Sequence, residues 1–205
     1  MRPRRVTGHP ILARPEGDKM GDRDEPYWVL RKDQLYCLRS AVRMDLVDHL
    51  AGRGPLSVRE LGEAVGMKPS AVYHHLRQLI AVELVREAGA RVANRKSEKL
   101  YETPSRRMRL RRALEDPANA AIMRELVEAL CRQAERDFAG GQKAGGNPSP
   151  GPDRSLGFFR LISRPTPDAL ARLNATLDQL FDILWEEPDP DQPAIALTWI
   201  LAPKE

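Results

Sequence analysis

The sequence predicts an α+β fold that is mainly α-helical and contains a small amount of β structure. Three observations support this prediction. Apolar residues recur every three or four positions in several segments, residues 57–81 form two short helical patterns joined by a tight turn, and residues 84–103 change to a strand-like pattern around a basic tip. With 205 residues, the chain is long enough for one sizeable domain or two small ones.

Residues 1–26 are rich in proline, glycine and charge, and we expect them to form a disordered N-terminal arm. The next segment, 33–51, predicts one continuous helix with Asp33 as its N-cap. Its apolar side chains follow helical spacing at Leu35, Leu38, Val42, Leu46 and Leu50.

The stretch "SVRELGEAVG" predicts a short helix with a capping box. Ser57 is the expected N-cap, Glu60 follows three residues later, and Gly66 is the expected end. A second helix over 69–81 has a buried stripe at Val72, Leu76, Leu79 and Ile80. A short helix, a tight turn and a longer helix are typical of the helix-turn-helix arrangement.

Residues 84–103 predict a β-hairpin with strands near 84–88 and 98–103 and a long, mobile tip. We expect the domain that contains this hairpin to cover residues 27–115. The run "RRMRLRR" at 106–112 then places five arginines in seven residues. It either clamps an anionic partner or solvates the start of the next helix.

That next helix, in the segment 116–139, is expected to begin with Asp116 as N-cap and Pro117 at the first helical position. Its wide apolar stripe fits packing against a second copy of the chain. A flexible linker over 140–154 follows. The stripe consists of Ile122, Met123, Leu126, Val127, Leu130, Cys131, Ala134 and Phe138.

The C-terminal segment, 155–205, is expected to form a small β-α-β unit. Its strands are predicted at 156–162 and 194–203, around a helix capped by Thr166. One helix between two strands is too small for an independent core, so a second copy of the chain is the economical partner. Trp185 and Trp199 belong either to this core or interface or, alternatively, to a pocket for an unidentified small-molecule effector.

Charge is distributed unevenly along the chain. Residues 31–112 carry 18 basic and 9 acidic side chains, a net +9, whereas residues 113–205 carry a net −6. A basic segment of this kind indicates an anionic partner, with nucleic acid first in line. No apolar run is long enough for a membrane helix, and the N-terminus lacks a secretory signal pattern. We expect a cytoplasmic protein in which Cys37 and Cys131 are free, buried thiols.

Residues 29–138 resemble the winged-helix transcriptional regulators of the ArsR type. The motifs that carry the resemblance are Arg43 after "SAV", the stretch "SVRELGEAVG", and "SAVYHHL" at 70–76, where His75 matches the family's histidine. The resemblance implies a homodimeric repressor that binds double-stranded DNA. The family usually has glycine where this chain has Glu83, so the helix exit must be made differently. The metal-binding residues of metal-sensing members are absent, and no cofactor is expected.

The resemblance places the helix over 69–81 in the major groove and the hairpin over 84–103, the wing, on the flanking DNA. Donors on the helix would reach base edges or phosphates, and cations of the wing would reach phosphates. The predicted DNA-binding residues are Lys68, Ser70, Ala71, Tyr73, His74 and Arg77 on the helix, with Arg91, Arg95, Lys96 and Lys99 on the wing.

The adjacent His74 and His75 raise two alternatives, a metal site and acid/base catalysis. Neighbouring helical positions point about 100° apart, so the pair cannot chelate one ion from one helix. No nucleophile motif lies nearby, so we predict no catalytic or metal-binding residue and no enzyme. We interpret His74 as a groove contact and His75 as a packed histidine bonded to the backbone or to a phosphate. A winged-helix module that binds protein and not DNA is the alternative function.

Overall fold

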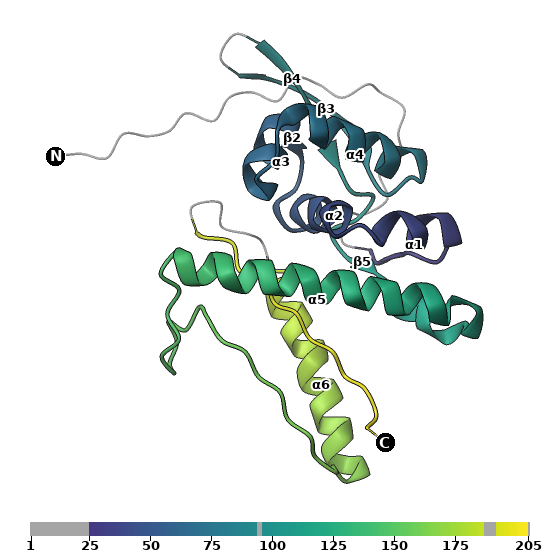
Figure 1. Cartoon of the computed structure of the whole chain (residues 1–205), viewed down its shortest axis with the longest axis vertical. Coiled ribbons are helices and arrows are strands. Elements are labelled where there is room, and N and C mark those ends of the chain that lie inside the picture. The colour runs from purple at the N-terminus through teal and green to yellow at the C-terminus, as the bar shows by residue number, and fades with distance from the viewer. Residues whose placement is uncertain (1–24, 94–95, 187–191, 205) are drawn as a thin grey trace, which may run out of the picture. The chain divides into compact units, whose positions relative to one another are not determined.

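The computed structural model describes residues 25–93, 96–186 and 192–204. The chain divides into two compact units, residues 1–123 and 124–205, which are described separately below. Figure 1 labels the helices and strands of both units. The predicted N-terminal arm lies almost entirely outside the described residues.

The first unit begins with two helices where the sequence predicted one. Helix α1 spans Lys32–Leu38 and α2 spans Ala41–Arg53, so the continuous helix over 33–51 was wrong. The backbone turns at Ser40, the N-cap of α2, and the Arg43 guanidinium donates to the carbonyl oxygen of Cys37. This bond satisfies a carbonyl left free at the end of α1, which stabilises the break. The N-cap of α1 is Arg31, not Asp33.

Helices α3 (Val58–Val65) and α4 (Pro69–Ala81) form the helix-turn-helix pair. The predicted capping box is confirmed, because Ser57 Oγ accepts from the Glu60 backbone N–H while the Glu60 carboxylate accepts from the Ser57 backbone N–H. Gly66 ends α3 in the left-handed region, with φ of 68°. Within α3, a Cβ at Gly62 would lie 2.7 Å from the carbonyl oxygen of Met67 in the turn, so only glycine permits this close approach.

The core of this unit is aliphatic. Most of the predicted stripes of α2 and α4 supply it together with Leu61 of α3, and Leu84 and Val85 after α4 close it. Ile80 was predicted to be buried but is 37% exposed, because it lies one helical position beyond Leu79, at the edge of the buried face. Burial of these side chains is the main source of the unit's stability. The leucine and valine side chains with an exposed fraction of 1% or less are Val29, Leu35, Leu46, Leu50, Leu61, Val72, Leu76, Leu79 and Leu84.

The wing is a hairpin of β3 (Arg86–Ala93) and β4 (Lys96–Glu102), longer strands than the sequence predicted. A short strand, β2 (Leu56–Ser57), completes an antiparallel sheet in the order β2-β4-β3. In Figure 1 the hairpin extends beyond α3 and α4. A β-bulge lies between Glu87 and Gly89, where Gly89 has φ of 104° and supplies the backbone conformation that side chains avoid.

Helix α4 ends at a left-handed residue although no glycine is present. Glu83 itself takes φ of 61°, and the N–H of Leu84 donates to the carbonyl oxygen of Leu79 at 3.0 Å. The Glu83 carboxylate accepts a hydrogen bond from the guanidinium of Arg31. Glu83 therefore ends the helix in the same left-handed conformation that glycine would supply. The expectation that glutamate ends this helix in a different conformation was wrong.

The first unit also contains a parallel pair formed by β1 (Tyr27–Trp28) and β5 (Met108–Arg109). This pair brings the arginine run over 106–112 beside the Trp28 ring. The guanidinium carbon of Arg112 lies 4.1 Å from the ring centroid, a cation–π distance. Part of the run therefore packs on an aromatic side chain.

After β5, two 3₁₀ turns, Arg111–Glu115 and Pro117–Asn119, precede α5 (Ala120–Lys143). Asp116 caps as predicted, since its carboxylate accepts from the Ala118 N–H at 2.9 Å, but it starts a 3₁₀ turn and not the α-helix. Helix α5 also runs to Lys143, so residues 140–143 of the predicted linker are helical. Cys131 is exposed, which corrects the prediction of two buried thiols, whereas Cys37 is buried.

The second unit contains α6 (Pro167–Leu184), whose predicted N-cap is confirmed because Thr166 Oγ1 accepts from the Ala169 N–H. Residues 156–162 and 194–203 are not strands, so the β-α-β prediction is wrong within the single chain. A strand requires a partner for its backbone groups, and none is supplied to these segments by the part of the chain that the structure describes. Phe181 lies 5.4 Å from Trp185 and 5.9 Å from Trp199, measured between ring centroids.

Candidate functional site

The outer face of α4 carries a set of exposed polar side chains. Ser70, Tyr73, His74 and Arg77 recur at helical spacing and all are exposed, while Val72 and Leu76 on the opposite side are buried. Tyr73 has an exposed fraction of 45%. The apolar face therefore fixes the helix in the core, and the opposite face presents hydrogen-bond donors to solvent. Of the remaining predicted helix residues, Lys68 is exposed and Ala71 is partly buried.

The two histidines separate as helical geometry requires. His74 is exposed, with its Nε2 3.3 Å from Nε2 of Gln78. His75 is partly buried, and its Nδ1 has no hydrogen-bond partner among the described residues, so the structure does not contain the expected backbone bond at that atom. Burial, with the nearby positive charge of Arg43, holds the pKa of His75 below its ordinary value. The rings meet edge to face, 5.5 Å apart.

No group of three histidine, cysteine or carboxylate side chains gathers in metal-binding geometry within residues 25–93, 96–186 and 192–204. The histidine pair therefore lacks nearby ligands in that part of the chain. Its neighbours are Gln78 and Arg43, which are joined by a hydrogen bond from the Arg43 guanidinium to the Gln78 side-chain oxygen.

The cations that the structure describes on the wing do not project freely into solvent. Arg91 Nη2 donates to Glu60 Oε1 at 2.8 Å and lies 3.7 Å from Glu98 Oε2. Lys99 Nζ donates to Glu87 Oε1 at 2.9 Å. Both cations are thus paired within the protein. Arg95 lies outside the described residues, as does the side chain of Lys96.

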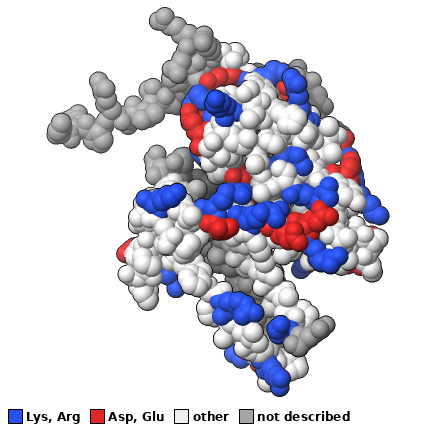
Figure 2. Space-filling model, in the orientation of Figure 1, with Lys and Arg blue, Asp and Glu red and all other residues white. Residues whose placement is uncertain are grey.

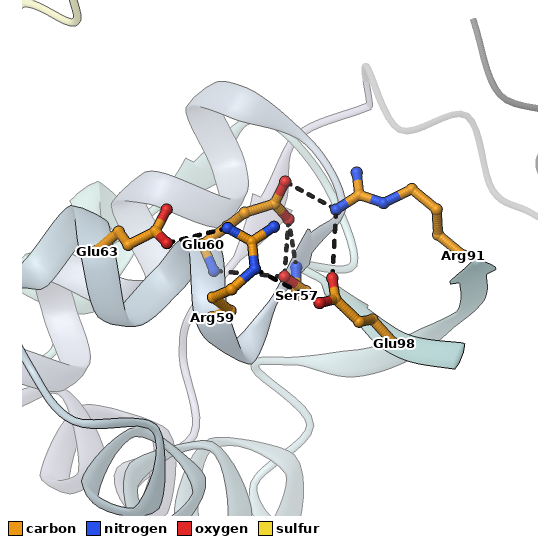
Figure 3. Close-up of polar contacts among 6 residues, drawn as sticks. All are labelled: Ser57, Arg59, Glu60, Glu63, Arg91 and Glu98. Carbon is orange, nitrogen blue, oxygen red and sulfur yellow. Dashed lines mark hydrogen bonds and ion pairs between the residues drawn. The ribbon is translucent and has the colours of Figure 1, made fainter. Parts of the chain in front are cut away.

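A polar network joins the wing to α3, and Figure 3 shows its members converging from both elements. Arg59 Nη1 contacts Glu63 Oε1 at 2.9 Å, and its Nε contacts Glu98 Oε1 at 3.4 Å. Together with the Arg91–Glu60 bond, these contacts hold the base of the wing against α3. Sequence reasoning missed Arg59 and Glu98, because the pairing depends on the register of the hairpin.

A notch of about 350 Å³ lies between α4 and the wing. Its polar lining comes from Tyr73 and Arg77 of α4 and from Glu87, Lys99 and Tyr101 of the wing. Tyr101 has an exposed fraction of only 4%. Its position beside α4 could not be derived from the sequence, because it depends on how the hairpin packs. The outer face of α4 and this notch form one continuous candidate surface.

Basic side chains outside this surface lie among acidic ones. Figure 2 shows Lys and Arg in several clusters on one face, with Asp and Glu between them. The excess of positive charge over residues 31–112 nevertheless makes the first unit basic as a whole. Such a balance favours anionic partners and imposes salt dependence on their binding.

Residues 38–88 match a family model described as a helix-turn-helix domain. This segment contains a helix-turn-helix domain. The match begins at the end of α1 and ends in β3, so it covers α3, α4 and the start of the wing. No curated protein matches the chain.

Several solved structures are similar at low identity. A MarR-family transcriptional regulator from Silicibacter pomeroyi is 19% identical, over 75% of this chain and 83% of that one, with a TM-score of 0.29. RV1404 from Mycobacterium tuberculosis is 15% identical, over 76% and 84%, with a TM-score of 0.30. A mutant of Lactococcus lactis ZitR in its apo form is 15% identical, over 71% and 83%, with a TM-score of 0.28. Superpositions this weak establish no shared function.

The structure adds one finding on membranes. None of the helices in the described part of the chain combines the length and the apolar character that a bilayer crossing needs.

Proposed function

We propose that this protein is a homodimeric, sequence-specific DNA-binding regulator that represses transcription. The observation that carries the proposal is the outer face of α4. Ser70, Tyr73, His74 and Arg77 stand exposed on a helix whose opposite side is anchored in the core. A helix held in this way can enter the major groove with its donors directed at base edges.

The chemistry of this face fits base reading. Arg77 can donate two hydrogen bonds to guanine, whose O6 and N7 accept both. The His74 ring and the Tyr73 hydroxyl can donate to bases or phosphates. A module that binds protein through the same face would need aliphatic side chains there, and the cluster of hydrogen-bond donors favours DNA. The matched helix-turn-helix segment, residues 38–88, supports the same assignment.

The wing supplies the flanking contact in this proposal. The network around Arg91 and Glu60 fixes the base of the hairpin against α3, so the wing keeps a constant angle to α4. Its more distal cations, including Lys96 and Arg95 as the sequence places them, then lie along the DNA backbone on one side of the groove.

Exposed apolar side chains support the homodimer. On α5, Val127 has an exposed fraction of 38%, and on α6 Leu173 has 42% and Leu184 has 48%. Phe158 and Phe159 are 90% and 86% exposed. Apolar surface of this extent in one small unit is typical of an interface, and a second copy of the chain is the partner that symmetry favours. A dimer also places two α4 helices on the two halves of a palindromic operator.

The same unit could instead sense a small molecule through Trp185 and Trp199. An effector pocket would enclose these rings in a largely apolar cavity. Trp199 is 41% exposed in the single chain, so we assign the aromatic cluster to the interface. The resemblance to ArsR-type regulators supports repression as the direction of control.

The experiment is a gel shift with the promoter of the gene's own operon over a range of salt concentrations. Wild-type protein is expected to bind, and binding is expected to weaken steeply as salt rises. Arg77→Ala and His74→Ala are expected to weaken binding, the first by about 1–3 kcal/mol if it contacts guanine. Unchanged binding in both variants would overturn the assignment of α4.

A further inference from the structure

Tyr101 is a buried phenol with an unused hydroxyl. Its exposed fraction is 4%, and within residues 25–93, 96–186 and 192–204 its hydroxyl makes no hydrogen bond. The ring is enclosed, whereas the hydroxyl reaches the surface at the notch and keeps its hydrogen-bonding capacity for a ligand. Tyr101 lines the notch between α4 and the wing, so a ligand in that notch can reach it.

The other polar groups of the notch are mostly donors. Tyr73 and Arg77 enter from α4, and Lys99 enters from the same strand as Tyr101, two residues away and therefore on the same face. Two cations and two phenols around one space of about 350 Å³ make a site for an anion with several acceptor oxygens.

One acidic group opposes this chemistry. Glu87 pairs with Tyr101 across the hairpin, and the bulge between Glu87 and Gly89 follows directly. Its carboxylate accepts from Lys99 Nζ through both oxygens, at 2.9 and 3.1 Å. The side chains of this pair remain 61% and 52% exposed, so the pair is weak enough to be exchanged.

We propose that the notch binds a phosphate of the DNA backbone and that Glu87 occupies Lys99 until this phosphate replaces it. This inference rests on the proposed function and extends it to Tyr101 and Glu87, which that function does not otherwise use. The notch opens between the helix assigned to the major groove and the wing assigned to the flanking backbone, where a phosphate must pass. The Tyr101 hydroxyl then donates a hydrogen bond to a phosphate oxygen, and Lys99 supplies the positive charge.

The test measures binding of a fluorescent duplex of random sequence by anisotropy, at a series of KCl concentrations. A phosphate contact carries no sequence information, so a random duplex is sufficient. Tyr101→Phe is expected to weaken binding about three- to tenfold. Lys99→Gln is expected to weaken it as well and to reduce the slope of log Kd against log salt by about one. Glu87→Gln is expected to tighten binding about two- to fivefold.

Matched controls separate the notch from general effects. Tyr36→Phe removes a hydroxyl from an exposed tyrosine of α1, and Lys143→Gln removes one positive charge from the end of α5. Both are expected to bind like wild type. Thermal unfolding checks that Tyr101→Phe is folded, and Lys99→Gln alters a side chain that is 61% exposed and cannot compromise the core.

Wild-type affinity and salt slope in both Tyr101→Phe and Lys99→Gln would overturn the notch while leaving the role of α4 intact. If the wild-type protein does not bind DNA at all, both the proposed function and the phosphate site in the notch are wrong. Inorganic phosphate distinguishes the source of the anion. If phosphate displaces the duplex better than chloride at equal ionic strength, and Tyr101→Phe abolishes the difference, the ion and the duplex compete for the notch as proposed. If phosphate binds in a manner that depends on Tyr101 but does not displace the duplex, the notch binds a free phosphate and the DNA assignment is wrong.

Discussion

Arg91 of the wing donates a 2.8 Å hydrogen bond to Oε1 of Glu60, whose Oε2 accepts from the backbone N–H of Ser57 at 2.8 Å. One carboxylate thus caps α3 and anchors the wing. The charge of this one side chain therefore contributes both to the start of α3 and to the attachment of the wing.

Glu60→Gln is expected to lower the free energy of unfolding by about 1 kcal/mol at neutral pH. Glutamine retains the shape of the cap but loses the charge that Arg91 and the Ser57 N–H stabilise. Burial acts to raise the pKa of Glu60, but the hydrogen bonds from Ser57 and Arg91 outweigh it and leave that pKa below its ordinary value.

The pH dependence follows from that direction. Wild-type stability from this carboxylate is present above the unfolded-state pKa and is lost as pH falls through the lower folded-state pKa. Urea unfolding should therefore show the gap between wild type and Glu60→Gln closing in acid. Glu63→Gln, at a carboxylate that is 65% exposed, is the control and should cost little. If the difference in the free energy of unfolding between wild type and Glu60→Gln stays the same in acid, the ionised Glu60 carboxylate does not stabilise the fold as described.

Glu83→Gly and Glu83→Ala are expected to differ although both remove the contact with Arg31. Glu83 has φ of 61°, a conformation that costs a non-glycine residue about 1 kcal/mol or more. Glycine relieves this strain and alanine does not, so the glycine variant should be more stable by about 1 kcal/mol. Thermal or urea unfolding of the two variants measures the difference. Equal stabilities would show that the helix exit is not strained.

His75 makes the first unit sensitive to mild acid. Burial, Arg43 and His74 lower the pKa of His75 in the folded state. Its contribution to stability is present above the unfolded-state pKa of about 6.5 and is lost as pH falls toward the folded-state value. The free energy of unfolding should therefore fall less steeply across this range in His75→Gln than in wild type. Parallel pH profiles for the two proteins would contradict this account.

The exposed apolar surface predicts an assembly twice the chain's 23.1 kDa mass. Leu173→Glu places a charge on the exposed apolar side of α6 and is expected to shift the protein toward monomer, because a buried, unpaired charge opposes association. Gln179→Glu adds the same charge at an exposed polar position of α6 and serves as control. Sedimentation equilibrium gives the masses. A monomeric wild-type protein would contradict the dimer.

Local patterns predicted several elements well. The capping box of Ser57 and Glu60, the bounds of α4 at 69–81 and the cap at Thr166 depend on residues close in sequence, so their spacing was sufficient. The separation of His74 from His75 also followed from helical periodicity alone.

Features set by distant residues could not be derived in this way. The break between α1 and α2 depends on Arg43 reaching back to Cys37, and the pairing of the wing cations depends on the register of β3 against β4. The segments 156–162 and 194–203 have strand-like composition but find no partner strand in the part of the chain that the structure describes. A strand exists only with its partner, so composition alone gave the wrong answer there.

The most direct measurement is selection of bound sequences from a pool of random duplexes, performed with wild type and with Arg77→Ala. Two α4 helices on a two-fold axis should enrich an inverted repeat whose half-sites lie about one helical turn apart. Arg77→Ala should lose preference at one position in each half-site while keeping the spacing. Failure of the wild-type protein to enrich any sequence, or an identical motif from the variant, would contradict the assignment of α4 as the element that reads DNA.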